Sequence, residues 1–172
     1  MLQSFVYIFI ALLVGCSTVT PEHEGLGFVF SGYWDVKHPN TYEVPGKYKI
    51  MEWVPRGQTI DNWSDLFTQQ NFTKRGIQDT PAELMNTLKA QMEEDCANVI
   101  WSVLEQTPNS ILYEWRIRDC PPHSDQHEIA RIIDGRLNRW RIAYTSKVIE
   151  IQPDKRVEWI ESLNSAHVMT GP

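Results

Sequence analysis

The amino-acid sequence predicts an α+β fold, with an antiparallel sheet of about five to six strands and two or three helices packed on one face of that sheet. Three observations support this class. Segments with the two-residue apolar period of strands and segments with helical spacing follow one another in blocks. Two pairs of strand-like segments flank short turn sequences, which is typical of antiparallel hairpins. The sequence contains neither an internal repeat nor a linker to a second domain.

The N-terminal half is expected to contain two strands and then two helices. Residues 26–36 and 48–54 are rich in aromatic and β-branched side chains, and turn sequences at 38–41 and at Pro45-Gly46 separate them. Residues 59–70 change to helical spacing, which would place Ile60, Trp63 and Phe67 on one face of a helix.

The clearest local signal is the start of the next helix. The sequence Thr80-Pro81-Ala82-Glu83 combines a capping box with a proline at the first helical position, where the missing N–H costs nothing. The spacing that follows predicts a buried stripe of three apolar side chains, Leu84, Leu88 and Met92.

The C-terminal half predicts two hairpins and a final helix. Residues 99–104 and 111–118 flank a turn at 107–110, and residues 128–133 and 139–144 flank a turn that begins at Asp134-Gly135. Residues 147–151 form either a last strand or a continuation of the previous one. Pro153 opens the final helix, whose inward side chains are expected to be Val157, Ile160 and Leu163.

Composition limits the class of partner. The chain has 172 residues and a formal net charge of −6. A nucleic-acid-binding protein would show a basic face and a high isoelectric point, so we do not expect nucleic acid to be a partner.

An apolar run near the N-terminus ends in the sequence Leu13-Val14-Gly15-Cys16. Its roughly ten residues would reach about 15 Å as a helix, which is half the thickness of a bilayer core and too short to span it. A run of this length is typical of the hydrophobic core of a secretory signal. The ending resembles the lipobox of bacterial lipoproteins. The resemblance implies cleavage before Cys16, lipidation of its thiol and acylation of the new N-terminus. Ser17 in the next position implies transfer to the outer membrane.

These features divide the chain into four parts. Residues 1–15 are expected to be a lipoprotein signal peptide, and residues 16–27 the lipidated cysteine and a polar tether. Residues 28–168 form a single α+β domain, and residues 169–172 a frayed tail.

Two cysteines remain beyond Cys16. In an exported chain, Cys96 and Cys120 are expected to form a disulfide, and two buried unpaired thiols are the alternative.

Four arginines alternate with apolar side chains in the hairpin segments: Arg116, Arg118, Arg139 and Arg141. Side chains two apart share a face of a strand, so matching registers would gather these arginines on one face that could bind an anionic partner. The alternative is surface arginines paired with neighbouring carboxylates.

The chemistry of metal sites and catalysis is weakly represented. Cys120, His123 and His127 have a spacing that zinc ligands could use, but a disulfide would consume Cys120. The familiar catalytic motifs are missing, so we expect neither an enzyme nor a cofactor other than the covalent lipid.

The expected function is therefore a lipid-anchored structural or interaction module on the periplasmic face of the outer membrane, with other envelope proteins as partners. A small α+β lipoprotein is similar in kind to the accessory lipoproteins of type IV secretion (Dot/Icm-like) outer-membrane complexes. The alternatives are a periplasmic domain that binds an anionic ligand through the arginines, or a small envelope enzyme or metalloprotein.

Overall fold

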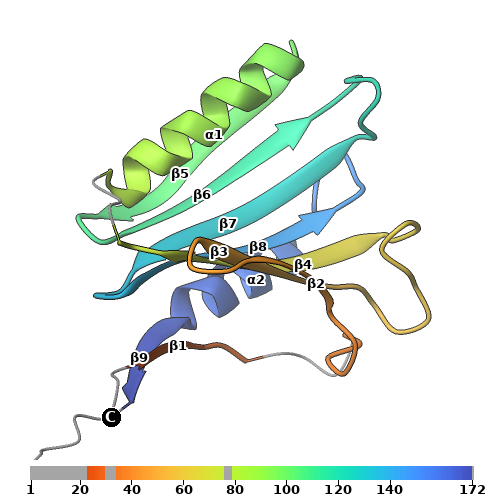
Figure 1. The fold of residues 1–172 in the computed structure, drawn as a ribbon. Coiled ribbons are helices and arrows are strands. Elements are labelled where there is room, and N and C mark those ends of the chain that lie inside the picture. The colour runs from red at the N-terminus through yellow and green to blue at the C-terminus, as the bar shows by residue number, and fades with distance from the viewer. Residues whose placement is uncertain (1–22, 30–33, 76–78, 172) are drawn as a thin grey trace, which may run out of the picture.

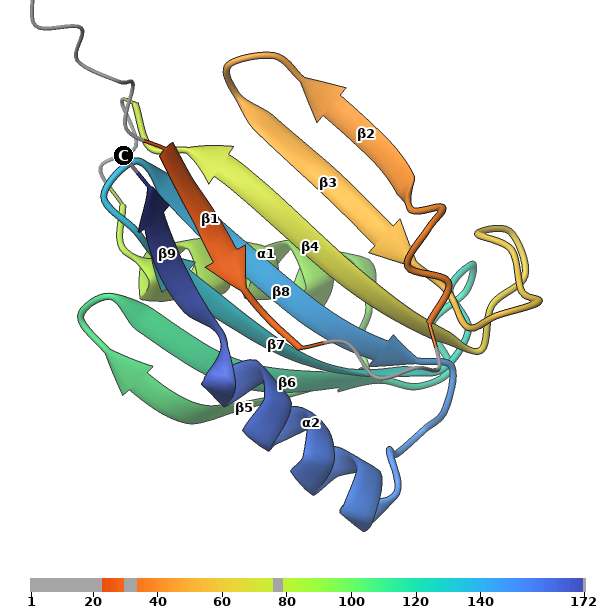
Figure 2. The same ribbon diagram turned by 90° about the horizontal axis from the view of Figure 1, so that it is seen from below.

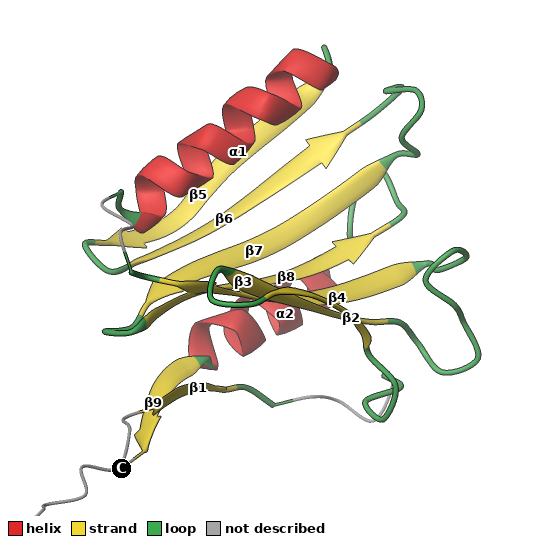
Figure 3. Cartoon of the chain, in the orientation of Figure 1, coloured by secondary structure: helices red, strands yellow, loops and turns green. Residues whose placement is uncertain are grey.

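A computed structural model describes residues 23–29, 34–75 and 79–171, in which a seven-stranded antiparallel sheet carries one helix on each face (Figures 1 and 3). The strands lie in the order β2-β3-β4-β8-β7-β6-β5. Their bounds are β2 Asn40–Val44, β3 Tyr48–Trp53, β4 Asp65–Thr73, β5 Val99–Thr107, β6 Ser110–Ile117, β7 Gln126–Asp134 and β8 Asn138–Ser146. Helix α1 spans Pro81–Asp95 and α2 spans Pro153–Ser165. The α+β class is confirmed, but the sheet has more strands than expected.

The two helices lie on opposite faces of the sheet, so the expectation of a single helical face is wrong. Figure 2, which turns the molecule by 90°, shows the same two layers flanking the sheet. Along β7, Ile129 and Ile133 belong to the core that contains Leu163 of α2, whereas Ala130 and Ile132 belong to the core that contains Met85 of α1. Neighbouring side chains of a strand point to opposite faces, so a strand that packs on both faces shows no polar side.

The predicted helix at 59–70 is wrong, because β4 begins at Asp65 and occupies the second half of this region. Its nine residues pair with β8 from Asp65 opposite Ser146 to Thr73 opposite Asn138. The adjacent side chains of Leu66 and Phe67 are both buried, one on each face of the sheet. Consecutive apolar residues of this kind remove the alternation of a one-sided strand and imitate the spacing of a helix.

The capping box of α1 is confirmed. Thr80 Oγ1 accepts a hydrogen bond from the Glu83 N–H at 3.2 Å, and Glu83 Oε2 accepts one from the Thr80 N–H at 2.7 Å. The expected stripe is displaced around the helix, however. Met85 is buried, whereas the three predicted positions Leu84, Leu88 and Met92 are only half-buried.

Both hairpins are confirmed as β5–β6 and β7–β8, and α2 begins at Pro153 as predicted. The inward face of α2 carries Trp159 and Leu163, whereas Val157 is 51% exposed, contrary to expectation. Residues 147–150 form bends, and neither they nor Ile151 belong to a strand. No helix in the described ranges is long and apolar enough to cross a membrane.

The two ends of the described chain pair with each other. Strand β1, His23–Gly27, lies antiparallel to β9, His167–Gly171 (Figure 1). The Glu24 carboxylate then accepts hydrogen bonds from the backbone N–H groups of Arg136 and Asn138, at 2.6 and 2.9 Å, and so attaches β1 to the β7–β8 turn. These strands occupy residues expected to be tether and frayed tail, so that expectation is wrong for 23–27 and 169–171.

Candidate functional site

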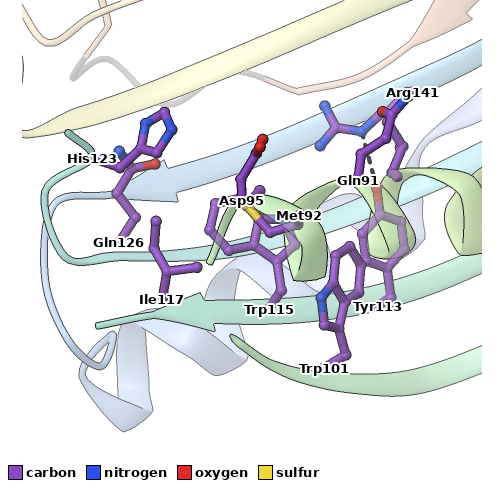
Figure 4. A pocket seen from close by; sticks show the side chains of 11 residues that line it. Gln91, Met92, Asp95, Trp101, Tyr113, Trp115, Ile117, His123, Gln126 and Arg141 are labelled. Atoms are coloured by element: carbon purple, nitrogen blue, oxygen red, sulfur yellow. Dashed lines mark hydrogen bonds between the residues drawn. The ribbon is translucent and has the colours of Figure 1, made fainter. Parts of the chain in front are cut away.

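A cleft of about 360 Å³ opens between α1 and the sheet, towards the C-terminal end of the helix (Figure 4). We call it the α1–sheet cleft. Its floor is largely apolar and comes from β5 and β6, namely Trp101, Tyr113, Trp115 and Ile117. One face of α1 forms its wall, with Leu88, Gln91, Met92 and Asp95. Three polar side chains complete the lining, namely His123, Gln126 and Arg141.

The floor is a continuous aromatic surface. Trp101 and Trp115 lie directly opposite each other on paired strands, with ring centroids 6.3 Å apart. Tyr113 shares the face of Trp115 because it lies two residues away on β6, and its ring stacks on Trp101 at 5.3 Å. The indole N–H of Trp101 is buried without a hydrogen-bond partner among the described residues, so the floor holds one unused donor.

A buried ion pair supports this floor. The Arg141 guanidinium lies against the Glu128 carboxylate, and Arg141 Nε donates to the Tyr113 hydroxyl at 3.0 Å. The Glu128 carboxylate also accepts hydrogen bonds from Trp115 Nε1 at 2.7 Å and from Thr145 Oγ1 at 2.9 Å. Two aromatic rings of the floor are therefore held by hydrogen bonds as well as by packing.

The electrostatics of the pair follow from its burial. Burial alone would lower the pKa of Arg141, but the nearby Glu128 charge outweighs it and the pKa is raised. Burial also raises the pKa of the Tyr113 phenol. The floor therefore keeps a guanidinium cation beside a neutral phenol, and Glu128 already balances the positive charge.

The four sequence-predicted arginines do not share a face. Arg141 and Arg139 lie on the α1 face of β8, whereas Arg116 lies on the α2 face of β6. Both strands pair with β7, which places Arg116 opposite His127 and Arg141 opposite Ile132. Positions 127 and 132 of β7 are an odd number of residues apart, so their side chains point to opposite faces. Arg139 is buried and pairs with Asp134 at 2.6 Å and Asp79 at 2.8 Å.

The remaining two arginines lie closer to solvent. Arg116 pairs with Glu150 at 2.9 Å, and the 62% exposed side chain of Arg118 lies 4.0 Å from Asp119. The expected cationic sheet face therefore does not form, since Arg139 and Arg141 are held in ion pairs, Arg116 lies on the opposite face and Arg118 lies beyond the end of β6.

Two of the three candidate metal ligands, Cys120 and His127, are already bonded to other groups. Cys120 is bonded to Cys96, with 5.4 Å between their Cα atoms, which confirms the expected disulfide. His127 Nδ1 accepts a hydrogen bond from the Ile151 N–H at 2.9 Å, which leaves the proton on Nε2, 3.3 Å from Glu114 Oε2. Both ring nitrogens of His127 are therefore occupied.

His127 is buried, and burial lowers its pKa while the Glu114 carboxylate partly opposes that shift. His123 instead lines the α1–sheet cleft. Within the described part of the chain, no group of three His, Cys, Asp or Glu side chains could hold a metal ion.

Sequence reasoning did not identify the cleft. The available signal was the set of seven tryptophans, two of which lie in consecutive segments of the predicted first hairpin. Only the strand pairing brings Trp101 and Trp115 together, and only the packing of α1 on the sheet sets the space beside them.

Comparison with protein-family models and with curated proteins finds no match for this chain. The chemistry of the cleft must therefore be judged from its own residues. Aromatic side chains, methionine and arginine are the types enriched where one protein binds another.

Proposed function

We propose that the protein is a lipid-anchored interaction module on the periplasmic face of the outer membrane, attached through Cys16, and that the α1–sheet cleft receives its partner. The observation that carries this proposal is the bond between Cys96 and Cys120. The chain has three cysteines, and two of them pair within the folded body. Structural disulfides persist in oxidising compartments such as the periplasm, which supports export. The third cysteine is the one at the end of the apolar N-terminal run.

The cleft supports the second half of the proposal. Its volume lies in the range of pockets that receive small ligands or a few side chains of a partner. The apolar floor and the methionine of its wall favour an apolar or aromatic group. Glu128 already neutralises Arg141, so the cleft should attract a negatively charged group only weakly.

Membership of a larger envelope assembly, such as a type IV secretion (Dot/Icm-like) outer-membrane complex, is the narrower form of this proposal. It rests on similarity in kind and size to accessory lipoproteins. The cleft supplies a surface through which such a module would join its neighbours.

The anchor is tested by feeding a clickable palmitate analogue to bacteria that produce the full chain. We expect label in the wild-type protein, which fractionates with the outer membrane, and no label in Cys16→Ser. A Cys96→Ala/Cys120→Ala variant is the matched control, because it removes two cysteines and should keep the label. An unlabelled wild-type protein would overturn the anchor.

The cleft is tested by photo-crosslinking in intact cells. A photoreactive amino acid in place of Gln91 lies in the cleft wall, whereas the same residue in place of the exposed Asn86 lies on α1 outside the cleft. We expect protein adducts from position 91 that Trp115→Ala weakens, and none from position 86. Equal adducts from both positions, or none from either, would count against the cleft as the partner site.

A further inference from the structure

A second hollow, of about 510 Å³, lies at the end of the molecule where β1 begins. In Figures 1 and 2 the start of β1, the end of β4 and the β7–β8 turn lie together at this end. The residues that line it are His23, Glu24, Thr73, Lys74, Arg75, Arg136, Leu137 and Asn138. We call it the basic hollow, because it contains three Lys or Arg side chains and one carboxylate.

The single carboxylate of the hollow offsets only part of its positive charge. Glu24 contributes that one negative charge, and two backbone N–H groups of the β7–β8 turn bind its carboxylate. Lys74 Nζ lies 3.1 Å from Asp134, a carboxylate that it shares with the buried Arg139. Arg75 is exposed and has no ion pair or side-chain hydrogen bond with any described residue. Among the described residues that line the hollow, three Lys or Arg side chains therefore lie beside one carboxylate, in a chain whose net charge is −6.

The opposite end of the molecule has the reverse character. Helix α1 starts beside the basic end, where Arg139 bonds Asp79, and it finishes with three exposed acidic residues, Glu93, Glu94 and Asp95. The α1–sheet cleft lies along the same C-terminal half of the helix. The cleft therefore lies beside these carboxylates, at the end of α1 that is far from the basic hollow.

The hollow is also close to the proposed anchor along the chain. His23 is seven residues after Cys16, so an extended chain allows at most about 25 Å between their Cα atoms. Electrostatic attraction to an anionic membrane falls off within about 8 Å at physiological salt. The short connection therefore lets the basic hollow reach the membrane surface.

We propose that the basic hollow binds the phosphate headgroups of anionic phospholipid in the membrane that holds the anchor, and so orients the α1–sheet cleft away from that membrane. This inference rests on lipid anchoring through Cys16. The orientation exposes the cleft to partners in the periplasm, and the acidic end of α1, which an anionic surface would repel, points the same way.

The test uses the lipidated full chain with a protease site introduced between Ser17 and Pro21. The protein is reconstituted into vesicles of phosphatidylcholine alone or with phosphatidylglycerol, the tether is cleaved, and the vesicles are floated at low salt. We expect the released body to stay on the vesicles that contain phosphatidylglycerol and to leave the others. One basic side chain near an anionic surface contributes about fivefold to partitioning, the equivalent of about 1 kcal/mol, so Arg75→Gln should lower the partition coefficient about fivefold.

Arg118→Gln is the matched control, because it removes the same charge from an exposed arginine at the opposite end and should leave partitioning unchanged. Equal loss in the two variants, or equal release from both kinds of vesicle, would overturn the basic hollow as the lipid site. Inorganic phosphate should displace the body better than sodium chloride of equal ionic strength, and equal displacement by the two salts would overturn recognition of the phosphate group. Uncleaved protein that fails to float on either vesicle would instead overturn the anchor.

Discussion

Removal of the Cys96–Cys120 disulfide should lower the free energy of unfolding by about 3.5 kcal/mol. The two residues are separated by 24 positions, and the closed loop contains the β5–β6 hairpin. In the chain-entropy model, a loop of about 25 residues costs the unfolded chain about 12 cal/mol/K, or about 3.5 kcal/mol at 25 °C. Because both cysteines are buried, Cys96→Ala/Cys120→Ala is the better variant, since serine would also bury a hydroxyl group.

The measurement is equilibrium denaturation at neutral pH, followed by tryptophan fluorescence and far-UV circular dichroism. The variant should unfold at lower denaturant and show a steeper dependence on denaturant, because its unfolded chain is less compact. Wild-type protein reduced before unfolding should match the variant, and a Cys16→Ser variant should match the oxidised wild type. A loss below about 1 kcal/mol would refute the loop-closure reasoning, since that is far less than a loop of this length predicts.

Three further predictions concern stability. Glu128→Gln leaves the Arg141 cation buried without its charge partner. The free energy of unfolding, measured by denaturant titration, should therefore fall by about 3–5 kcal/mol. A change within about 0.5 kcal/mol would contradict a buried ion pair. Burial lowers the pKa of His127 in the folded chain, so the unfolded chain should bind a proton there at higher pH than the folded chain does. The free energy of unfolding should therefore fall as the pH is lowered from about 6.5 to about 5, above the range where carboxylates titrate. His127→Gln should reduce that fall. Thr80→Ala removes the cap of α1 and should cost about 1 kcal/mol, whereas Thr80→Ser should restore most of it and an equal loss in both would contradict a capping role.

The disulfide also bears on the proposed binding site. Cys96 is the C-terminal cap of α1, and Cys120 precedes the loop that carries His123 and leads to Gln126, so the bond joins two walls of the α1–sheet cleft. Reduction should therefore weaken partner crosslinking from Gln91 as well as stability. This links the redox state of the compartment to the shape of the cleft.

Local signals in the sequence were sufficient for several elements. The capping box at Thr80, the proline that opens α2 and the turns of both hairpins all depend on residues within a few positions of one another. Strand β4 was missed because Leu66 and Phe67 pack on different faces of the sheet, and a strand buried on both sides loses the two-residue alternation. The β1–β9 pairing was missed because its partners lie at opposite ends of the sequence.

The candidate sites show the same division. The pairing of Cys96 with Cys120 followed from counting cysteines in a chain expected to be exported, and the structure confirms it. The arginine face failed because alternation within a strand says which side chains share a side, but not how two strands align with each other. The α1–sheet cleft, the Glu128–Arg141 pair and the basic hollow all combine residues from separate elements.

The sequence by itself determined the α+β class, the starts of α1 and α2 and the two hairpins, and it favoured the disulfide, because each depends on short-range patterns or on a small set of possible partners. Only the tertiary structure decided that the helices occupy opposite faces and that α1 leaves a cleft beside an aromatic floor. It also decided that basic side chains gather where β1 begins. These features depend on strand register and on packing between distant segments, which a linear pattern does not specify.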